Sequence, residues 1–144
     1  MKKIKVKIFT ESGAPVPVYM TEGASGADLF AFEDTVIKPK EAVLVRTGVR
    51  IEIEDGYECQ VRPRSGYSMK NKILILNSPG TIDSDYRGEI KVIMYNLSDE
   101  SFSVKKNDRI AQMVFAEVIK AEFISEKLEE SARGEGGFGH TGGM

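Results

Sequence analysis

A short run near the middle of the chain combines acidic and aromatic side chains that could take part in catalysis. Residues 80–88 read Gly-Thr-Ile-Asp-Ser-Asp-Tyr-Arg-Gly, so Asp83, Asp85 and Tyr86 lie within four positions. A carboxylate in such a place can act as the general base for a water molecule, and the aromatic ring can pack against a sugar. Asp and Ser are also common turn residues, because their side chains bond to the nearby backbone. On this segment alone, the turn is favoured for each aspartate.

A second segment offers the donors that phosphate groups need. Residues 62–66 read Arg-Pro-Arg-Ser-Gly and supply two guanidinium groups, one hydroxyl and backbone N–H groups next to a glycine. Such a donor set suits phosphate oxygens. A guanidinium group can donate two parallel hydrogen bonds to one phosphate, and free backbone N–H groups can donate further ones. A surface turn with solvated arginines explains the same residues, and on this segment alone it is somewhat favoured.

Two more polar segments lie next to predicted strands. Residues 24–29 form a turn of small residues, in which Asp28 could orient a metal-bound water. In residues 108–112, Arg109 could pair with Asp28 or with another acid, and Gln112 could reach a ligand. An aspartate that ends a turn and an ordinary surface salt bridge explain these residues as well, and each is favoured for its segment in isolation.

The C-terminal residues 133–144 differ in composition from the rest of the chain. Six of these twelve residues are glycine, which is typical of a flexible tail. Arg133 and Phe138 are unusual residues for a pure linker. Their presence indicates that the tail closes over a ligand or another part of the protein.

Alternating sequence predicts the strands that would hold these segments. Apolar and charged residues alternate over residues 3–9 and 49–53, as in strands with one buried face. Residues 90–95 are apolar on both faces, so we expect a second sheet or another subunit to cover the second face. One helical turn is expected at residues 65–70, with Ser65 as its cap. Further strands are predicted at residues 42–46, 57–61, 73–76, 101–104 and 111–118.

Length, charge and strand spacing limit the class of protein. A chain of 144 residues fits one domain, and many short strands predict an all-β fold, a jelly-roll-like barrel or sandwich. We expect this domain over residues 1–132, followed by the glycine-rich tail. The net charge of −2 provides no basic surplus for a phosphate backbone, so we expect no nucleic-acid partner.

Cysteine use and the N-terminal residues bear on the compartment. Cys59 is the only cysteine, so no intrachain disulfide or thiolate metal site can form, and we expect a buried, inert thiol. Residues 1–9 are basic and alternating, without a long apolar run. We therefore expect neither a signal peptide nor a membrane span, and a cytoplasmic location.

Five segments in order resemble the five motifs of the trimeric dUTPase family. They are residues 24–29, 62–66, 80–88, 108–112 and 133–142, and together they span nearly the whole chain. One such motif would be weak evidence for the family. Five motifs in the same order are specific, and they outweigh the interpretation of each segment as an ordinary turn or salt bridge. The resemblance implies a jelly-roll-like β fold and a homotrimer with three active sites at subunit interfaces. It also implies Mg²⁺ as cofactor, held mainly by the triphosphate of the substrate.

The same resemblance implies the reaction. Members of the family hydrolyse dUTP to dUMP and pyrophosphate by in-line attack of water at the α-phosphorus, which keeps uracil out of DNA and supplies dUMP for thymidylate synthesis. Asp83 resembles the general base of this reaction. Tyr86 resembles the ring that packs under deoxyribose and excludes a 2′-hydroxyl, and Asn77 resembles the amide that reads the uracil edge. Asp28 resembles the acid that holds the metal through water.

The remaining implied contacts are with the phosphates and the base. In the tail, Phe138 resembles the ring that stacks on uracil, and Arg133 resembles the clamp on the γ-phosphate. His140 stands where many members have serine, so it is either a phosphate contact or an exposed tail histidine. Asn107 stands where glycine is usual and tolerates the same left-handed turn. Further substrate contacts are implied for Arg64, Ser65, Gly66, Gly80, Thr81, Ile82, Gln112 and Gly139.

Two other functions compete with this interpretation. A dCTP deaminase resembles the family in fold, but it uses a glutamate base and carries a second serine where this chain has Gly66. A β-sandwich binding module that kept only the fold predicts the loss of Asp83, Tyr86 or the tail, and all three are present. A dual role, in which nucleotide-dependent closure of the tail also signals to a protein partner, stays open.

Overall fold

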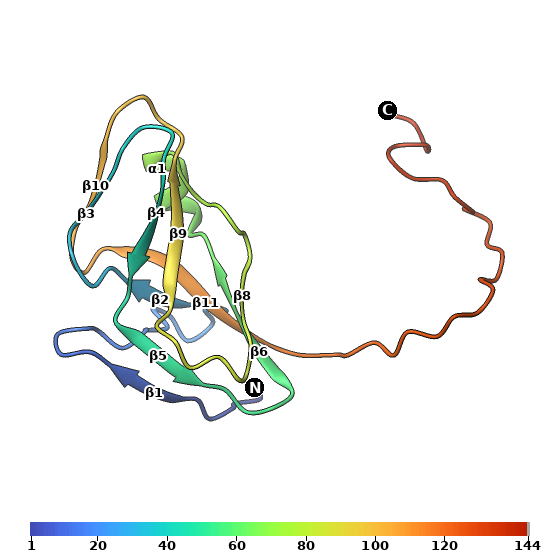
Figure 1. Ribbon diagram of the computed structural model, residues 1–144, viewed down its shortest axis with the longest axis horizontal. Helices are drawn as coiled ribbons and strands as arrows, with labels where there is room; N and C mark the ends of the chain where they lie inside the picture. Colours follow the sequence, from blue (N-terminus) through green and yellow to red (C-terminus); the bar gives the residue numbers. More distant parts are fainter. Residues whose placement is uncertain (144) are drawn as a thin grey trace.

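The computed structural model describes residues 1–143, and its regular elements are β-strands except for one short helix (Figure 1). The one helix, α1 (Ser65–Asn71), follows β6 and packs near β7. In chain order the strands are β1 (Lys7–Thr10), β2 (Ala27–Phe30), β3 (Thr35–Ile37), β4 (Ala42–Arg46), β5 (Val49–Glu52), β6 (Tyr57–Arg62), β7 (Ile73–Ile75), β8 (Gly80–Ile82), β9 (Lys91–Asn96), β10 (Phe102–Val104) and β11 (Arg109–Glu117). No helix within residues 1–143 is long and apolar enough to cross a membrane.

Two main antiparallel sheets enclose one hydrophobic core. The larger has the strand order β2-β11-β6-β8 and the smaller the order β4-β9-β7, and two two-stranded sheets, β1-β5 and β10-β3, complete the domain. Both main sheets contribute buried side chains to a single cluster, among them Leu29, Cys59 and Met113 from the larger sheet and Val45, Val92 and Met94 from the smaller. The all-β prediction is confirmed, and the architecture is a jelly-roll-like sandwich rather than a closed barrel.

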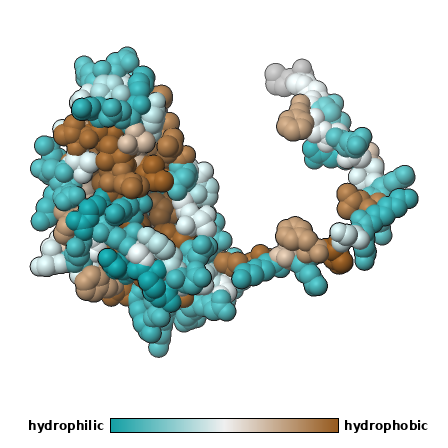
Figure 2. Space-filling model, in the orientation of Figure 1, coloured by the Kyte–Doolittle hydropathy of each residue, from teal (hydrophilic) through white to brown (hydrophobic). Residues whose placement is uncertain are grey.

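Among the described residues, strand β9 has one buried face and one partly exposed face. Val92 and Met94 point into the core, whereas Ile93 and Tyr95 on the other face are half-buried. Leu44 lies opposite Ile93 and is 57% exposed, and Leu74 lies opposite Tyr95 and is also exposed. Figure 2 shows apolar side chains gathered on the face over β4 and β9. Within the described residues no second sheet covers this face, which leaves another subunit as the expected cover.

Several boundaries differ from those predicted. The first strand begins only at Lys7, and strands β3 and β8 were not predicted; β8 lies in the segment 80–88, for which a turn was favoured. The assignment of Ser65 as helix cap was wrong. Arg64 has extended backbone angles, and its carbonyl accepts the first helical hydrogen bond, from Ser68 N–H. Arg64 is thus the N-cap residue, without a side-chain cap, and Ser65 already lies in the helix.

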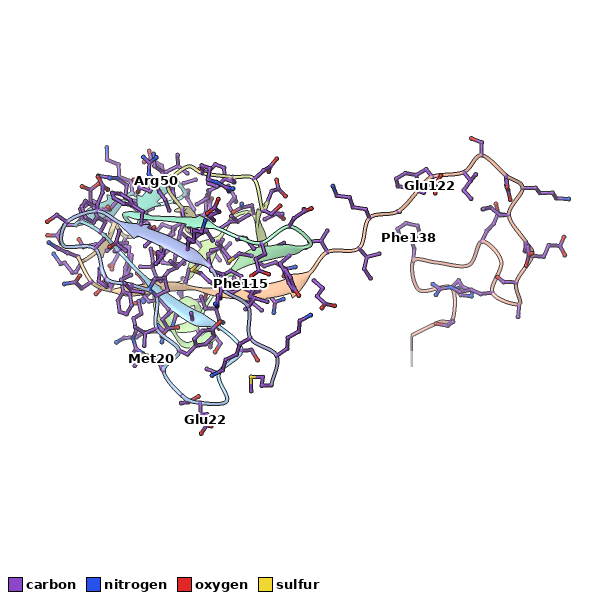
Figure 3. All side chains as sticks on the ribbon, turned by 90° about the horizontal axis from the view of Figure 1, so that it is seen from below. Met20, Glu22, Arg50, Phe115, Glu122 and Phe138 are labelled. Carbon is purple, nitrogen blue, oxygen red and sulfur yellow. The ribbon has the colours of Figure 1, made fainter. Side chains whose placement is uncertain are left out.

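The chain leaves the domain after β11 as a long arm (Figure 1). Its last backbone bond to the domain is donated by Val118 N–H to Gly56 O, and the later backbone bonds described lie within the arm. Large apolar side chains of the arm are almost fully exposed: Ile119, Phe123, Leu128 and Phe138. Figure 3 shows Glu122 and Phe138 out on the arm, away from Phe115 in the domain. The arm of the structure thus begins well before Arg133.

Candidate functional site

A cavity of about 470 Å³ opens where β8 and the loop after it meet the start of β9. Its apolar walls include Val61, Ile75 and Val92, from three different strands. Six of the residues singled out in the sequence line this cavity: Asn77, Gly80, Thr81, Ile82, Asp83 and Tyr86. The fold thus brings the Asn77 amide together with the Asp83 carboxylate and the Tyr86 ring of the segment 80–88.

Strand pairing fixes the position of this segment. Strand β8 pairs with β6 alone, with Gly80 opposite Val61 and Ile82 opposite Cys59. The outer edge of β8 therefore has backbone N–H and C=O groups without a strand partner among residues 1–143. Gly80 matters sterically, because a Cβ there would lie 3.2 Å from Asn77 Nδ2. The missing side chain leaves room for the Asn77 amide beside the strand.

Asp83 and Tyr86 lie at the rim of the cavity. The Asp83 carboxylate is exposed, and no side-chain hydrogen bond or ion pair involves it within residues 1–143. Tyr86 N–H donates to Asp83 O over 3.1 Å, so the two residues share one turn. The Tyr86 hydroxyl donates to Glu89 O over 2.9 Å, which folds the ring back along the loop. Asp83 is therefore a carboxylate free to bind water, next to a fixed aromatic ring.

A second group of residues gathers around Asp28. Arg64 Nε lies 3.3 Å from Asp28 Oδ1, and Arg109 Nη1 lies 3.3 Å from Asp28 Oδ2. Arg64 Nη1 also donates to Arg109 O over 3.0 Å. Asp28 is buried, whereas both arginines are partly open to solvent. Two guanidinium groups share one carboxylate, so the group keeps a net positive charge that can attract an anion.

Neighbouring positions of the larger sheet add polar groups beside this cluster. Gln112 lies between Asp28 on β2 and Arg62 on β6, and its Nε2 donates to Pro63 O over 2.9 Å. Gly26 allows this arrangement, because a Cβ at that position would lie 2.3 Å from Gln112 Oε1. Ser65 and Gly66 are exposed in the first turn of α1, where backbone N–H groups lack helical partners.

The tail residues reach neither group in a single chain. Phe138 is fully exposed, and Arg133 Nε donates to Gly136 O within the arm. The His140 ring packs on Gly136, since a Cβ there would lie 2.4 Å from its Nε2, and Gly139 has a positive φ. Within residues 1–143 no side-chain hydrogen bond or ion pair joins the cavity residues to the Asp28 cluster. One chain thus presents three separate groups of candidate residues.

The described residues form no metal site made of protein ligands alone. Within residues 1–143 no group of three or more His, Cys, Asp or Glu side chains could hold a metal ion. Asp28 is a single carboxylate, and both of its oxygens already face arginines. A divalent ion at this place would therefore take most of its ligands from a bound molecule and from water.

Sequence reasoning missed three residues near these groups. Arg46 on β4 pairs with Glu89, which lines the cavity, although 43 positions separate them. The Tyr67 hydroxyl is buried without a partner among the described residues, and burial raises the pKa of Tyr67. Glu89 follows the glycine that ends the central motif, so its position was a usable signal. No sequence signal marked Arg46, because only the pairing of strands in the folded sheet brings it next to Glu89.

Comparison with known proteins identifies close relatives over the full length. The dUTPase family model matches residues 12–142. The deoxyuridine 5′-triphosphate nucleotidohydrolase of Nautilia profundicola is 54% identical over 141 residues, covering 97% of this chain and 99% of that protein. The enzyme of the same name from Helicobacter pylori J99 is 55% identical, covering 97% of each chain. The structure of the Staphylococcus bacteriophage 80alpha dUTPase with dUPNHPP superposes with a TM-score of 0.89 at 26% identity, covering 97% of this chain and 99% of that one.

Proposed function

The chain belongs to the dUTPase family, and we propose that it hydrolyses dUTP to dUMP and pyrophosphate with the help of Mg²⁺. The observation that carries this proposal is the unpaired Asp83 carboxylate at the rim of a cavity large enough for a nucleoside. The relatives named as deoxyuridine 5′-triphosphate nucleotidohydrolases support the choice of substrate.

The cavity suits the nucleoside end of the substrate. The free edge of β8 and the Asn77 amide offer donors and acceptors for the uracil edge. Cytosine presents the opposite donor and acceptor at two positions, so it would leave buried polar groups unpaired. The Tyr86 ring would pack against the sugar and leave no space for a 2′-hydroxyl. These contacts support selection for both uracil and deoxyribose.

The Asp83 carboxylate supplies the base for hydrolysis. Asp83 would accept a proton from a water molecule while the water oxygen attacks the α-phosphorus. The bond from the α-phosphorus to its bridging oxygen breaks, and the electron pair leaves with pyrophosphate. Such phosphoryl transfer depends mainly on position and on neutralisation of charge. Arg64, Gln112 and the first turn of α1 provide the phosphate contacts, and Arg133 would add one when the tail closes.

The Asp28 cluster fits a magnesium ion that arrives with the triphosphate. Mg²⁺ in nucleotide sites keeps several waters and takes one or two carboxylates besides the phosphates. Asp28 is buried next to two arginines, so it suits contact through water better than direct coordination. When bound, the ion would neutralise charge on the phosphates. Arg64 and Arg109 would add to this neutralisation from the protein side.

The arrangement of the three groups supports a homotrimer with active sites at subunit interfaces. No hydrogen bond or ion pair of residues 1–143 links the cavity, the Asp28 cluster and the tail within one chain, which supports a site completed by another subunit. The exposed apolar face with Leu44, Leu74 and Ile93 is a suitable contact surface for a threefold assembly. The exposed apolar residues of the arm suit a place on a neighbour. The tail would then close over a bound nucleotide and place Phe138 on the base.

Substitution of the base tests this proposal. We expect Asp83→Asn to bind dUTP almost normally, because the phosphate donors remain, while kcat falls about 10²–10⁴-fold through loss of the base. Binding is measured by calorimetry with a non-hydrolysable dUTP analogue, and turnover by release of pyrophosphate. Asp85→Asn, two residues away, is the matched control. Near-normal turnover by Asp83→Asn would remove Asp83 from this role.

A further inference from the structure

An arginine on β4 holds the end of the loop that carries Asp83 and Tyr86. Arg46 Nε donates to both carboxylate oxygens of Glu89, over 3.2 and 3.1 Å, and Arg46 Nη2 donates to Glu89 Oε1 over 2.8 Å. The Glu89 side chain is only 10% exposed, and its Oε2 also faces Gly48 N–H at 3.4 Å. Bidentate pairs of this kind fix direction as well as distance.

Arg46 is itself held from several sides. Its Nη2 also pairs with Glu11, and its guanidinium lies 4.8 Å from the centre of the Phe32 ring. Strand pairing places Arg46 opposite Lys91, two positions after Glu89. The arginine is therefore a fixed point of the sandwich, and Glu89 is attached to it.

The fixed Glu89 in turn determines where the Tyr86 ring lies. The Tyr86 hydroxyl donates to the Glu89 carbonyl over 2.9 Å. The ring crosses Gly88 so closely that a Cβ there would lie 2.3 Å from the hydroxyl oxygen and 2.5 Å from Cζ. Glu89 thus connects two contacts: its side chain is anchored to Arg46, and its carbonyl anchors the tyrosine.

Glu89 lines the cavity but is poorly suited to act as an acid or base. Burial alone would raise the pKa of Glu89, but hydrogen bonds from Arg46 and Gly48 and the charge of Arg46 outweigh burial and lower it. Both carboxylate oxygens are occupied by these donors. Glu89 therefore stays ionised and serves as an anchor for the loop.

We infer that Arg46, acting through Glu89, is a positioning residue that sets the discrimination between deoxyribose and ribose at Tyr86. The inference rests on the proposed function, in which the Tyr86 ring packs against the sugar. A ring held at one end by the Glu89 carbonyl cannot move aside to admit a 2′-hydroxyl. A ring freed from this contact can move, so UTP would be accepted more often.

The test compares the enzyme with dUTP and with UTP. The variants are Arg46→Ala, Arg46→Lys and Tyr86→Phe, and kcat and KM are measured for both nucleotides by release of pyrophosphate. We expect Arg46→Ala and Tyr86→Phe each to lower the ratio of kcat/KM for dUTP to that for UTP by about tenfold, mainly through KM. Arg46→Lys should recover part of the ratio, because it keeps the charge but not the bidentate geometry.

Two controls separate this inference from its alternatives. Val104→Ala, in the buried core, should lower the melting temperature without changing the ratio, since β10 pairs with β3 and not with a strand next to the loop. Tyr86→Phe keeps the ring and so tests the hydroxyl contact even if Arg46→Ala does not fold. A wild-type protein that releases no pyrophosphate from dUTP would contradict the proposed function itself. An active wild type whose Tyr86→Phe and Arg46→Lys variants keep the full ratio would overturn only the positioning role.

Discussion

Arg64 Nε lies 3.3 Å from Asp28 Oδ1, which ties the start of α1 to the buried strand β2. Arg109 faces the other oxygen of the same carboxylate at the same distance. The carboxylate therefore holds two guanidinium groups in place without neutralising both. A site of this kind is organised for an anion before the anion arrives, so little ordering remains to be done on binding.

Loss of Asp28 should loosen both arginines. We expect Asp28→Ala to raise KM for dUTP about tenfold, equivalent to about 1.4 kcal/mol of binding, and to shift the Mg²⁺ requirement to higher concentration. Steady-state kinetics at several Mg²⁺ concentrations would measure both effects. Asp99→Ala, which removes an exposed partner of Lys40, is the matched control and should change neither. An unchanged KM in Asp28→Ala would show that the arginines keep their positions without the carboxylate.

Much of the fold could be predicted from the sequence because many short apolar or alternating segments follow one another along the chain. Residues 42–46, 49–53 and 57–61 were predicted within one residue of β4, β5 and β6. Asn107 adopts the expected left-handed backbone, with φ of 70°. The pairing of Arg109 with Asp28 was one of two options left open, and the structure contains it.

What the sequence did not reveal depends on contacts between distant elements. Arg46 and Glu89 meet only because β4 pairs with β9, and no local pattern marks such a pair. Strand β8 lies in the segment for which a turn was favoured, although it carries part of the cavity. The cytoplasmic location, the boundary at Arg133 and the roles of the tail residues stay predictions.

Removal of the tail tests whether it closes the site. We expect a chain truncated after Ala132 to fold, since no hydrogen bond or ion pair of tail residues 133–143 reaches the domain. Its kcat/KM for dUTP should fall about 10²-fold, because the tail would no longer hold the γ-phosphate and the uracil ring in a site closed to water. Circular dichroism checks the fold and pyrophosphate release checks the activity. Full activity of the truncated protein would make the tail a linker only.

Mixed oligomers test whether one site needs groups from different subunits. Asp83→Asn and Arg64→Ala should each be nearly inactive alone. When the two are unfolded and refolded together, we expect about a quarter of wild-type activity, because some sites then combine an intact Asp83 with an intact Arg64 from a neighbour. The same mixture prepared without unfolding is the control. If both groups of a site came from one chain, no activity would return.

Cys59 allows a prediction about pH. The thiol is fully buried on β6, and burial, followed by the nearby Glu58 charge, raises its pKa from 9.0 to about 12. Between these values the unfolded chain loses the thiol proton and the folded protein keeps it, so this group makes stability fall as pH rises from 9 toward 12. We expect Cys59→Ala to show a shallower loss of stability over this range in urea unfolding.

A reagent test complements the pH series. At pH 8 the native protein should react with a thiol reagent far more slowly than the urea-unfolded protein, since the thiol is both protonated and inaccessible. Rapid labelling of the native protein would contradict the burial of Cys59.

The most direct measurement is the release of pyrophosphate and of ammonia by the purified protein with Mg²⁺, with dUTP, dCTP, dTTP and UTP offered separately. We predict pyrophosphate from dUTP, little or none from the other three, and no ammonia. That result would establish the reaction, the selection for uracil and the exclusion of ribose together. Ammonia from dCTP would assign the protein to deamination, and no product from any nucleotide would contradict its assignment as an enzyme of this class.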